Sequence, residues 1–188
     1  TLYFSVRWHN DMKHKSDLLL SGIFLGVSLS TKWSGIFLLP ILGIDYGIFW
    51  IRRKKFPPVS SILRTMFVWI IIPCVVYVLS FTQFWLQGHT WDQFKELHNQ
   101  IWYYQTHLKA THTYQSVPWE WFLDLRPVWM YVDYSQPEKV GNIYNLGNPV
   151  VFWVGIVALL WMIIQFIKTK KWVYEFLLLS YGFVWMPW

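Results

Sequence analysis

The residues best suited to chemistry lie together in one polar stretch, residues 87–147. Within it, Trp119 and Trp121 come shortly before Arg126, and His112 precedes all three. Flat aromatic faces stack on the C–H surfaces of sugar rings, and an arginine guanidinium binds phosphate through two parallel hydrogen bonds. A histidine can donate a hydrogen bond to phosphate or to a sugar hydroxyl. The types and spacing of these residues therefore indicate a site for a sugar phosphate.

Each of these residues also has a simpler structural interpretation. Tryptophan is enriched at the membrane–water interface, where it anchors a protein at the depth of the lipid headgroups. Arg126 could form an ion pair with Asp124 or Glu120, and His112 could make a structural hydrogen bond. Anchoring explains any single tryptophan, but it explains less well why aromatic residues gather beside a cation.

Lys32 and Trp33 form a second candidate site, because they interrupt an apolar block at residues 18–51. The Lys32 ammonium could meet a lipid phosphate at the membrane surface. The alternative is that it extends from an apolar helix to the interface, as lysine side chains commonly do.

Histidines could also bind a metal ion, and four of them lie in the polar stretch. They are spaced too widely to match a helical pair of ligands at i and i+4. We therefore predict no metal site and no cofactor. The four histidines are His89, His98, His107 and His112.

The composition identifies the class of protein that must position these side chains. The chain has 188 residues, of which 55% are apolar and 14% charged, with 15 Trp, 11 Tyr, 14 Phe and a single Cys. Disordered chains are poor in aromatic residues, and disulfide-rich secreted domains need several cysteines. The formal net charge of +6 is typical of a nucleic-acid-binding domain, but the apolar fraction is too high for that class. Of these classes, only a membrane protein fits the composition, and we expect no nucleic-acid partner.

The apolar segments predict an all-α polytopic membrane protein of GT-C-like helical type, with about five transmembrane or re-entrant helices. A helix over residues 18–51 would be too long for one span, so we expect a break near Lys32. Pro73 lies inside another span and is expected to kink it. The expected helices lie near residues 18–31, 34–51, 65–86, 150–167 and 172–188.

The charges predict the orientation in the membrane. Three basic clusters, at residues 13–15, 52–55 and 168–171, would lie on one face, which the positive-inside rule assigns to the cytoplasm. Residues 87–147 contain four basic and six acidic residues and would lie on the extracytoplasmic face of the cell membrane.

An amphipathic helix is expected at the start of this outer segment, over residues 91–107. Apolar side chains recur there every three or four residues, with charged and amide side chains between them. Such a helix would lie on the outer membrane surface or pack on the outer part of the protein itself.

Four segments resemble motifs of the protein O-mannosyltransferase family, in the same order and with the same spacing. Residues 22–35 (GIFLGVSLSTKWSG) are similar to its G-x-x-x-G-x-x-x-x-x-K-W-x-G segment, and residues 112–121 (HTYQSVPWEW) to its H-x-Y-x-S-x-P-W-x-W run. Residues 126–129 (RPVW) and 143–149 (IYNLGNP) resemble the patterns that follow in prokaryotic members. The Gly-x-x-x-Gly pair alone would be a weak signal, since it mostly marks helix packing.

The resemblance implies a GT-C enzyme that transfers mannose, with inversion, from polyprenyl-phosphate mannose to Ser or Thr of a protein. The 188 residues would form the C-terminal transmembrane region of a longer chain. The family's catalytic Asp-Glu pair would then lie in the missing N-terminal half, so no catalytic residue is expected in this segment. The nearest outer carboxylate in an aromatic setting, Asp133, does not match that motif.

The expected role of this segment is to bind the donor phosphate and sugar beside membrane lipid. The candidate residues for that role are Lys32, Trp33, His112, Tyr114, Ser116, Trp119 and Arg126. Two other functions stay open: a related GT-C enzyme that transfers another lipid-linked sugar to lipid, and a non-enzymatic transporter. The few acidic residues within the expected spans argue against the transporter.

Overall fold

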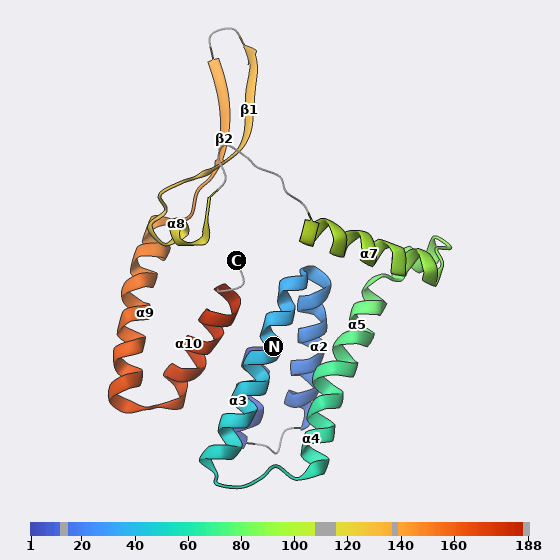
Figure 1. Cartoon of the computed structure of the whole chain (residues 1–188), viewed down its shortest axis with the longest axis vertical. Coiled ribbons are helices and arrows are strands. Elements are labelled where there is room, and N and C mark those ends of the chain that lie inside the picture. The colour runs from blue at the N-terminus through green and yellow to red at the C-terminus, as the bar shows by residue number, and fades with distance from the viewer. Residues whose placement is uncertain (12–14, 108–115, 137–138, 186–188) are drawn as a thin grey trace. The chain divides into compact units, whose positions relative to one another are not determined.

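The computed structural model describes residues 1–11, 15–107, 116–136 and 139–185, which fall into two compact units (Figure 1). The first unit is Thr1–His98 with Leu179–Pro187, and the second is Asn99–Leu178 with Trp188. The first contains α1 (Leu2–Asp11), α2 (Lys15–Thr31), the 3-10 helix η1 (Trp33–Phe37), α3 (Leu38–Arg52), α4 (Val59–Met66), the π-helix η2 (Phe67–Ile71), α5 (Ile72–Ser80) and α6 (Thr82–Leu86). The helix α7 (Trp91–His107) begins in the first unit and ends in the second.

The second unit continues with one hairpin and three helices. They are α8 (Pro118–Leu123), β1 (Val128–Gln136), β2 (Lys139–Asn145), α9 (Pro149–Thr169) and α10 (Trp172–Trp185), whose last residues belong to the first unit. The strands β1 and β2 pair antiparallel, with Val128 opposite Asn145. This hairpin was not part of the prediction. Its first strand, VWMYVDY, is rich in the β-branched and aromatic residues that favour strands.

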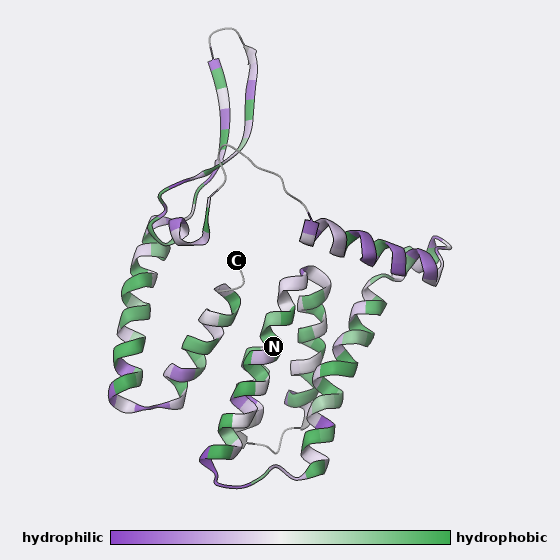
Figure 2. Ribbon diagram, viewed as in Figure 1, coloured by the Kyte–Doolittle hydropathy of each residue, from purple (hydrophilic) through white to green (hydrophobic). Residues whose placement is uncertain are grey.

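The chain is a predominantly helical polytopic membrane protein. Three helical segments among the described residues are long and apolar enough to cross a membrane: Trp33–Arg52, Val59–Ser80 and Pro149–Thr169. The apolar helix over Ser16–Thr31 is shorter. In Figure 2 these helices are mostly green, whereas α7 carries many hydrophilic residues.

Two glycines allow α2 to pack closely on its neighbours. A Cβ atom on Gly22 would lie 2.2 Å from the backbone oxygen of Val68, and one on Gly26 would lie 2.6 Å from Cβ of Val76. Neither clash could be relieved by a side-chain rotation, because the obstructing atoms belong to backbone or to a branched Cβ. The Gly-x-x-x-Gly pair therefore serves helix packing.

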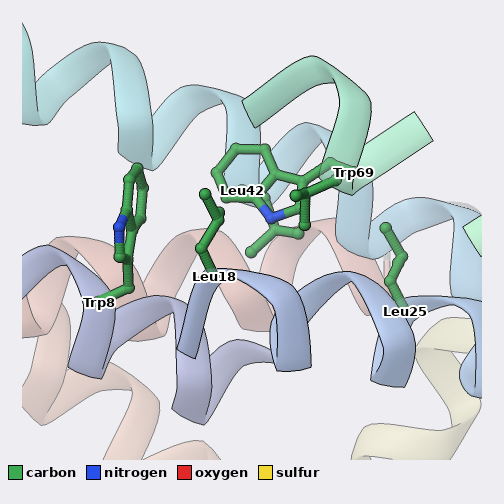
Figure 3. Close-up of a cluster of buried hydrophobic side chains, with 6 residues drawn as sticks. Trp8, Leu18, Leu25, Leu42 and Trp69 are labelled. Carbon is green, nitrogen blue, oxygen red and sulfur yellow. The ribbon is translucent and has the colours of Figure 1, made fainter. Parts of the chain in front are cut away.

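The core of the first unit lies where α1, α2, α3 and η2 meet (Figure 3). Its buried apolar side chains are Trp8, Leu18, Leu25, Leu42, Val68 and Trp69. The Trp69 indole N–H donates to Oγ of Ser21 at 2.8 Å, and that hydroxyl donates to the carbonyl of Leu18. The one polar group of this tryptophan is thus satisfied inside the core.

Pro73 is accommodated by a change of helix type. Proline lacks an N–H, and its ring would clash with the carbonyl four residues earlier in a regular α-helix. The π-helix η2 lies directly before it, and helical structure runs on from Val59 to Ser80. A π-helical segment thus precedes the proline that was predicted to kink this helix, and such segments are a known form of helix irregularity.

Candidate functional site

The Lys32 turn separates two apolar helices of the first unit. The helix α2 ends at Thr31, Lys32 has extended backbone (φ −156°, ψ 134°), and η1 begins at Trp33. The Lys32 N–H donates to the Ser28 carbonyl, and the Gly35 N–H donates to the Lys32 carbonyl. A Cβ on Gly35 would lie 2.8 Å from the backbone of Ser28. The predicted helix break is thus present, and it needs glycine at position 35.

Trp33 is held by two residues from distant parts of the first unit. Its indole N–H donates to the Tyr77 hydroxyl at 2.8 Å, and that hydroxyl lies 2.7 Å from Nε2 of His98. The Trp33 and His98 rings also stack, with their centroids 5.8 Å apart. We call Trp33, Tyr77 and His98 the Trp33 cluster. Sequence analysis did not identify Tyr77, and it treated His98 only as a possible metal ligand.

The second unit builds its site around the short helix α8. Pro118 occupies the first turn, where its missing N–H costs nothing. The Glu120 carboxylate accepts from the Val117 N–H at 2.9 Å, and the Trp121 indole N–H donates to Oγ of Ser116 at 2.9 Å. These bonds fix the start of the helix and the plane of the Trp121 ring.

The end of α8 is tied to the end of the hairpin. Asp124 adopts a left-handed backbone conformation (φ 53°) that closes the helix, and its Oδ1 accepts from the Gly147 N–H at 3.1 Å. A Cβ on Gly147 would lie 2.5 Å from the Phe152 ring. Glycine at 147 thus leaves room for the Phe152 ring beside the Asp124 carboxylate.

A cavity of about 240 Å³ lies among these elements, and we call it the Arg126 pocket. It combines an aromatic wall with hydroxyl, amide, carboxylate and guanidinium groups, which is the mixture expected of a polar ligand site. Its lining residues are Ser116, Glu120, Trp121, Asp124, Arg126, Val128, Asn145, Gly147 and Phe152.

The predicted site residues divide into three groups. Ser116 and Arg126 line the pocket, whereas Trp119 is 68% exposed and is not among the lining residues. Lys32 and Trp33 belong to the first unit. The calls on His112 and Tyr114 fall outside the described residues.

Several lining residues were absent from the predicted site, although a sequence signal for some of them existed. Asn145 and Gly147 lie in the IYNLGNP segment, which had been used only as a mark of the family. Trp121 had been named with Trp119 as an aromatic face for a sugar, but only Trp119 was kept among the candidate donor-binding residues. Motif membership alone did not tell which of two neighbouring tryptophans faces the cavity.

Metal-binding groups do not gather in the described part of the chain. No three His, Cys, Asp or Glu residues there are close enough to share a metal ion. His98 is engaged in the Trp33 cluster, and Nδ1 of His107 lies 2.8 Å from Oγ1 of Thr106.

Comparison with known proteins relates the chain to one family. Residues 90–186 match the family described as the C-terminal four TMM region of protein-O-mannosyltransferase. The chain is 24% identical to polyprenol-phosphate-mannose–protein mannosyltransferase of Mycolicibacterium smegmatis, over 89% of the chain and 40% of that protein. The same-named proteins of Corynebacterium glutamicum and Mycobacterium tuberculosis are 23% and 21% identical, with equal coverage.

These relatives are much longer than the chain, which spans about two fifths of their length. No solved structure matches it. The family match covers α7, α8, the hairpin, α9 and α10. By this match over more than half of its residues, the chain belongs to the protein O-mannosyltransferase family.

Proposed function

We propose that this chain forms part of a membrane enzyme that transfers mannose from polyprenyl-phosphate mannose to Ser or Thr of a protein. Family membership and the names of the relatives support this activity. Within the enzyme, we assign the chain to binding the donor sugar and phosphate. The observation that carries this assignment is the Arg126 pocket.

The chemistry of the pocket suits a sugar phosphodiester. The Trp121 ring offers a flat face to the sugar, and the Asn145 amide can bond its hydroxyls. One oxygen each of Glu120 and Asp124 is bound to backbone N–H, which leaves further lone pairs to accept from hydroxyls. A phosphodiester carries a single negative charge, and Arg126 supplies the matching cation in fork geometry. At about 240 Å³, the cavity suits one sugar ring rather than the whole carrier lipid.

The proposed reaction inverts the configuration at the anomeric carbon. The oxygen of the acceptor hydroxyl forms a bond to C1 of mannose, and the bond from C1 to the phosphate oxygen breaks. The electron pair leaves with polyprenyl phosphate, and the hydroxyl proton passes to a general base. By family resemblance that base lies in the N-terminal part of the enzyme. Arg126 stabilises the negative charge that develops on the leaving phosphate.

The proposed orientation follows from the charges. Residues 87–147 and the Lys32 turn would lie on the extracytoplasmic face, and the basic loops at residues 52–55 and 168–171 on the cytoplasmic face. Lys32, which is exposed at the turn of the first unit, would supply a cation for a lipid phosphate at headgroup depth.

The full-length enzyme in detergent tests this function directly. It is incubated with radiolabelled polyprenyl-phosphate mannose and a peptide that contains Ser and Thr, and a peptide with Ala at those positions is the control. We expect label in the first peptide alone. Label in lipid but not in peptide would identify a lipid-modifying relative, and label in neither would contradict mannose transfer.

A further inference from the structure

We propose that Tyr77 and His98 are positioning residues, which hold the Lys32 turn so that the Lys32 ammonium meets a lipid phosphate at headgroup depth. The inference rests on the proposed function, because it deepens the role given there to Lys32. Tyr77 lies 44 positions after Trp33, and His98 lies a further 21 positions along the chain.

The hydrogen bonds of the Trp33 cluster form one directed chain. The Phe94 carbonyl can only accept, and Nδ1 of His98 lies 2.7 Å from it, so Nδ1 carries the proton. In the neutral ring Nε2 then accepts, and the Tyr77 hydroxyl donates to it. The same hydroxyl oxygen accepts from the Trp33 indole. Each donor in the cluster thus has one acceptor, which fixes the orientation of all three rings.

Aromatic packing holds His98 in place. Phe94, which is only 7% exposed, contacts its ring at a centroid distance of 4.1 Å, and the Phe81 ring lies 5.5 Å away. Phe94 itself packs on Phe81 and Trp85. The first turns of α7 are therefore docked on the ends of α5 and α6, and His98 extends this contact to η1.

The cluster acts on Lys32 through the backbone. Trp33 follows Lys32 directly, and two backbone hydrogen bonds close the turn around Lys32. The cluster holds the Trp33 ring at its nitrogen and at its face, and the turn bonds tie Lys32 to this neighbour. A long flexible lysine gains most from such preorganisation, because its side chain is costly to order on binding.

The far end of the same helix offers a matched control. Tyr103 and His107 also stand at i and i+4 and stack, with ring centroids 4.4 Å apart. The contact from Nδ1 of His107 to the Tyr103 carbonyl is longer, at 3.2 Å, and Tyr103 is 63% exposed. This pair repeats the four-residue spacing of Phe94 and His98 outside the Trp33 cluster.

The test is a double-mutant cycle in the full-length enzyme, read out as the KM for polyprenyl-phosphate mannose at saturating acceptor peptide. The variants are Lys32→Met, His98→Asn, Tyr77→Phe and the double variant Lys32→Met/His98→Asn. Asparagine places its amide near the position of Nδ1 but does not reach Tyr77. We expect His98→Asn and Tyr77→Phe each to raise the donor KM about 10-fold, since misplacement of a binding group by about 1 Å has large effects. His107→Asn should leave it unchanged.

The decisive comparison is between Lys32→Met and the double variant. If His98 acts through Lys32, the two should have the same donor KM within about twofold, because coupled residues are not additive. A donor KM in the double variant that equals the product of the two single effects would show an independent structural role for His98 and would overturn the inference. So would an unchanged donor KM in Lys32→Met or in folded His98→Asn. His98→Gln can still accept a hydrogen bond from Tyr77, so its donor KM should rise less than that of His98→Asn. His98→Gln replaces His98→Asn in the test if His98→Asn does not fold.

Binding of polyprenyl phosphate without sugar separates this inference from the proposed function. The affinity of the detergent-solubilised full-length enzyme is measured for wild type and the same variants. If the wild type moves no mannose to peptide yet His98→Asn and Lys32→Met weaken carrier binding equally, the proposed function fails and the positioning role stands. Equal carrier affinity in wild type and His98→Asn would reject the positioning role even in an active enzyme.

Discussion

The Trp33 cluster and the Arg126 pocket combine the same kinds of side chain in two different ways. Both contain an indole whose N–H donates to a hydroxyl, Tyr77 in one and Ser116 in the other. In the cluster that hydroxyl continues to a histidine, and the chain of bonds ends on a backbone carbonyl. In the pocket the indole lines a cavity of about 240 Å³.

This difference separates residues that position from residues that bind. Trp33 uses its nitrogen and one face inside the protein, so we assign it to positioning the Lys32 turn. Trp121 uses its nitrogen to fix its own plane and presents its ring to the pocket. Substitutions in the pocket should therefore affect turnover more than stability, and substitutions in the first unit's packing should do the reverse.

The largest effect is expected for Arg126→Ala in the full-length enzyme. Loss of the cation at the leaving phosphate should lower kcat/KM for mannose transfer about 100-fold, or about 2.7 kcal/mol, as for other electrostatic groups at a developing charge. The thermal midpoint should not change. Arg126→Lys keeps the charge but not the two parallel hydrogen bonds, so its kcat/KM should lie between those of Arg126→Ala and wild type. Lys139→Ala on the hairpin should have the kcat/KM of wild type. Equal activity of Arg126→Ala and wild type would remove the pocket from the mechanism.

A second substitution tests the packing of the first unit. Gly22→Ala places a Cβ at 2.2 Å from the Val68 backbone oxygen, whereas Cβ on Gly43 would meet nothing within 4 Å. We expect Gly22→Ala to destabilise the protein by about 1–3 kcal/mol, as overpacking does. Gly43→Ala should leave stability unchanged or slightly higher. Thermal unfolding in detergent measures both, and equal midpoints would contradict the close approach of α2 and η2.

Trp121→Ala should have a smaller effect on turnover than the loss of Arg126. It removes the aromatic wall but leaves the cation, so we expect the KM for donor to rise about 10-fold, in the range of a lost aromatic contact. The exposed neighbour provides the control, because Trp119→Ala should change the donor KM less than about twofold. A larger rise in donor KM for Trp119→Ala than for Trp121→Ala would show that Trp119, as the sequence suggested, is the tryptophan that contacts the sugar.

The smallest effect is expected on the hairpin, at Asp133. The Ser135 N–H donates to its Oδ1 at 2.8 Å and holds the pKa of this carboxyl below its ordinary value. Because this pKa is depressed, the carboxyl is charged at every pH above its ordinary pKa and becomes protonated only as the pH falls below that value. Asp133 is thus poorly matched to the role of a general base near neutral pH. Asp133→Asn should leave the pH profile of transfer from pH 5 to 8 unchanged, and a lost limb of that profile would contradict this.

Local patterns in the sequence predicted the local structure well. The three- and four-residue spacing over residues 91–107 predicted α7, which has these bounds. The break at Lys32 followed from helix length against membrane thickness. The hairpin was not predicted, because β1 lies in a segment that had been interpreted only through its aromatic residues and its motif.

The long-range contacts could not be predicted in this way. Nothing in the local sequence of Tyr77 or His98 indicates that they meet Trp33, since each lies on a different helix. The choice of Trp121 over Trp119 depends on the bond to Ser116, which fixes one ring and leaves the other exposed. Such contacts arise from tertiary packing, which no periodicity of a single chain records.

Photo-crosslinking tests the central claim, that the Arg126 pocket holds the donor's sugar phosphate, most directly. The full-length enzyme is irradiated with polyprenyl-phosphate mannose that carries a small photoreactive group on the sugar, and the labelled peptides are identified by mass spectrometry. We predict label within residues 116–128 or 145–152, which excess unlabelled donor removes and Arg126→Ala reduces. Label that unlabelled donor removes, but that lies only outside these two segments, would contradict the account.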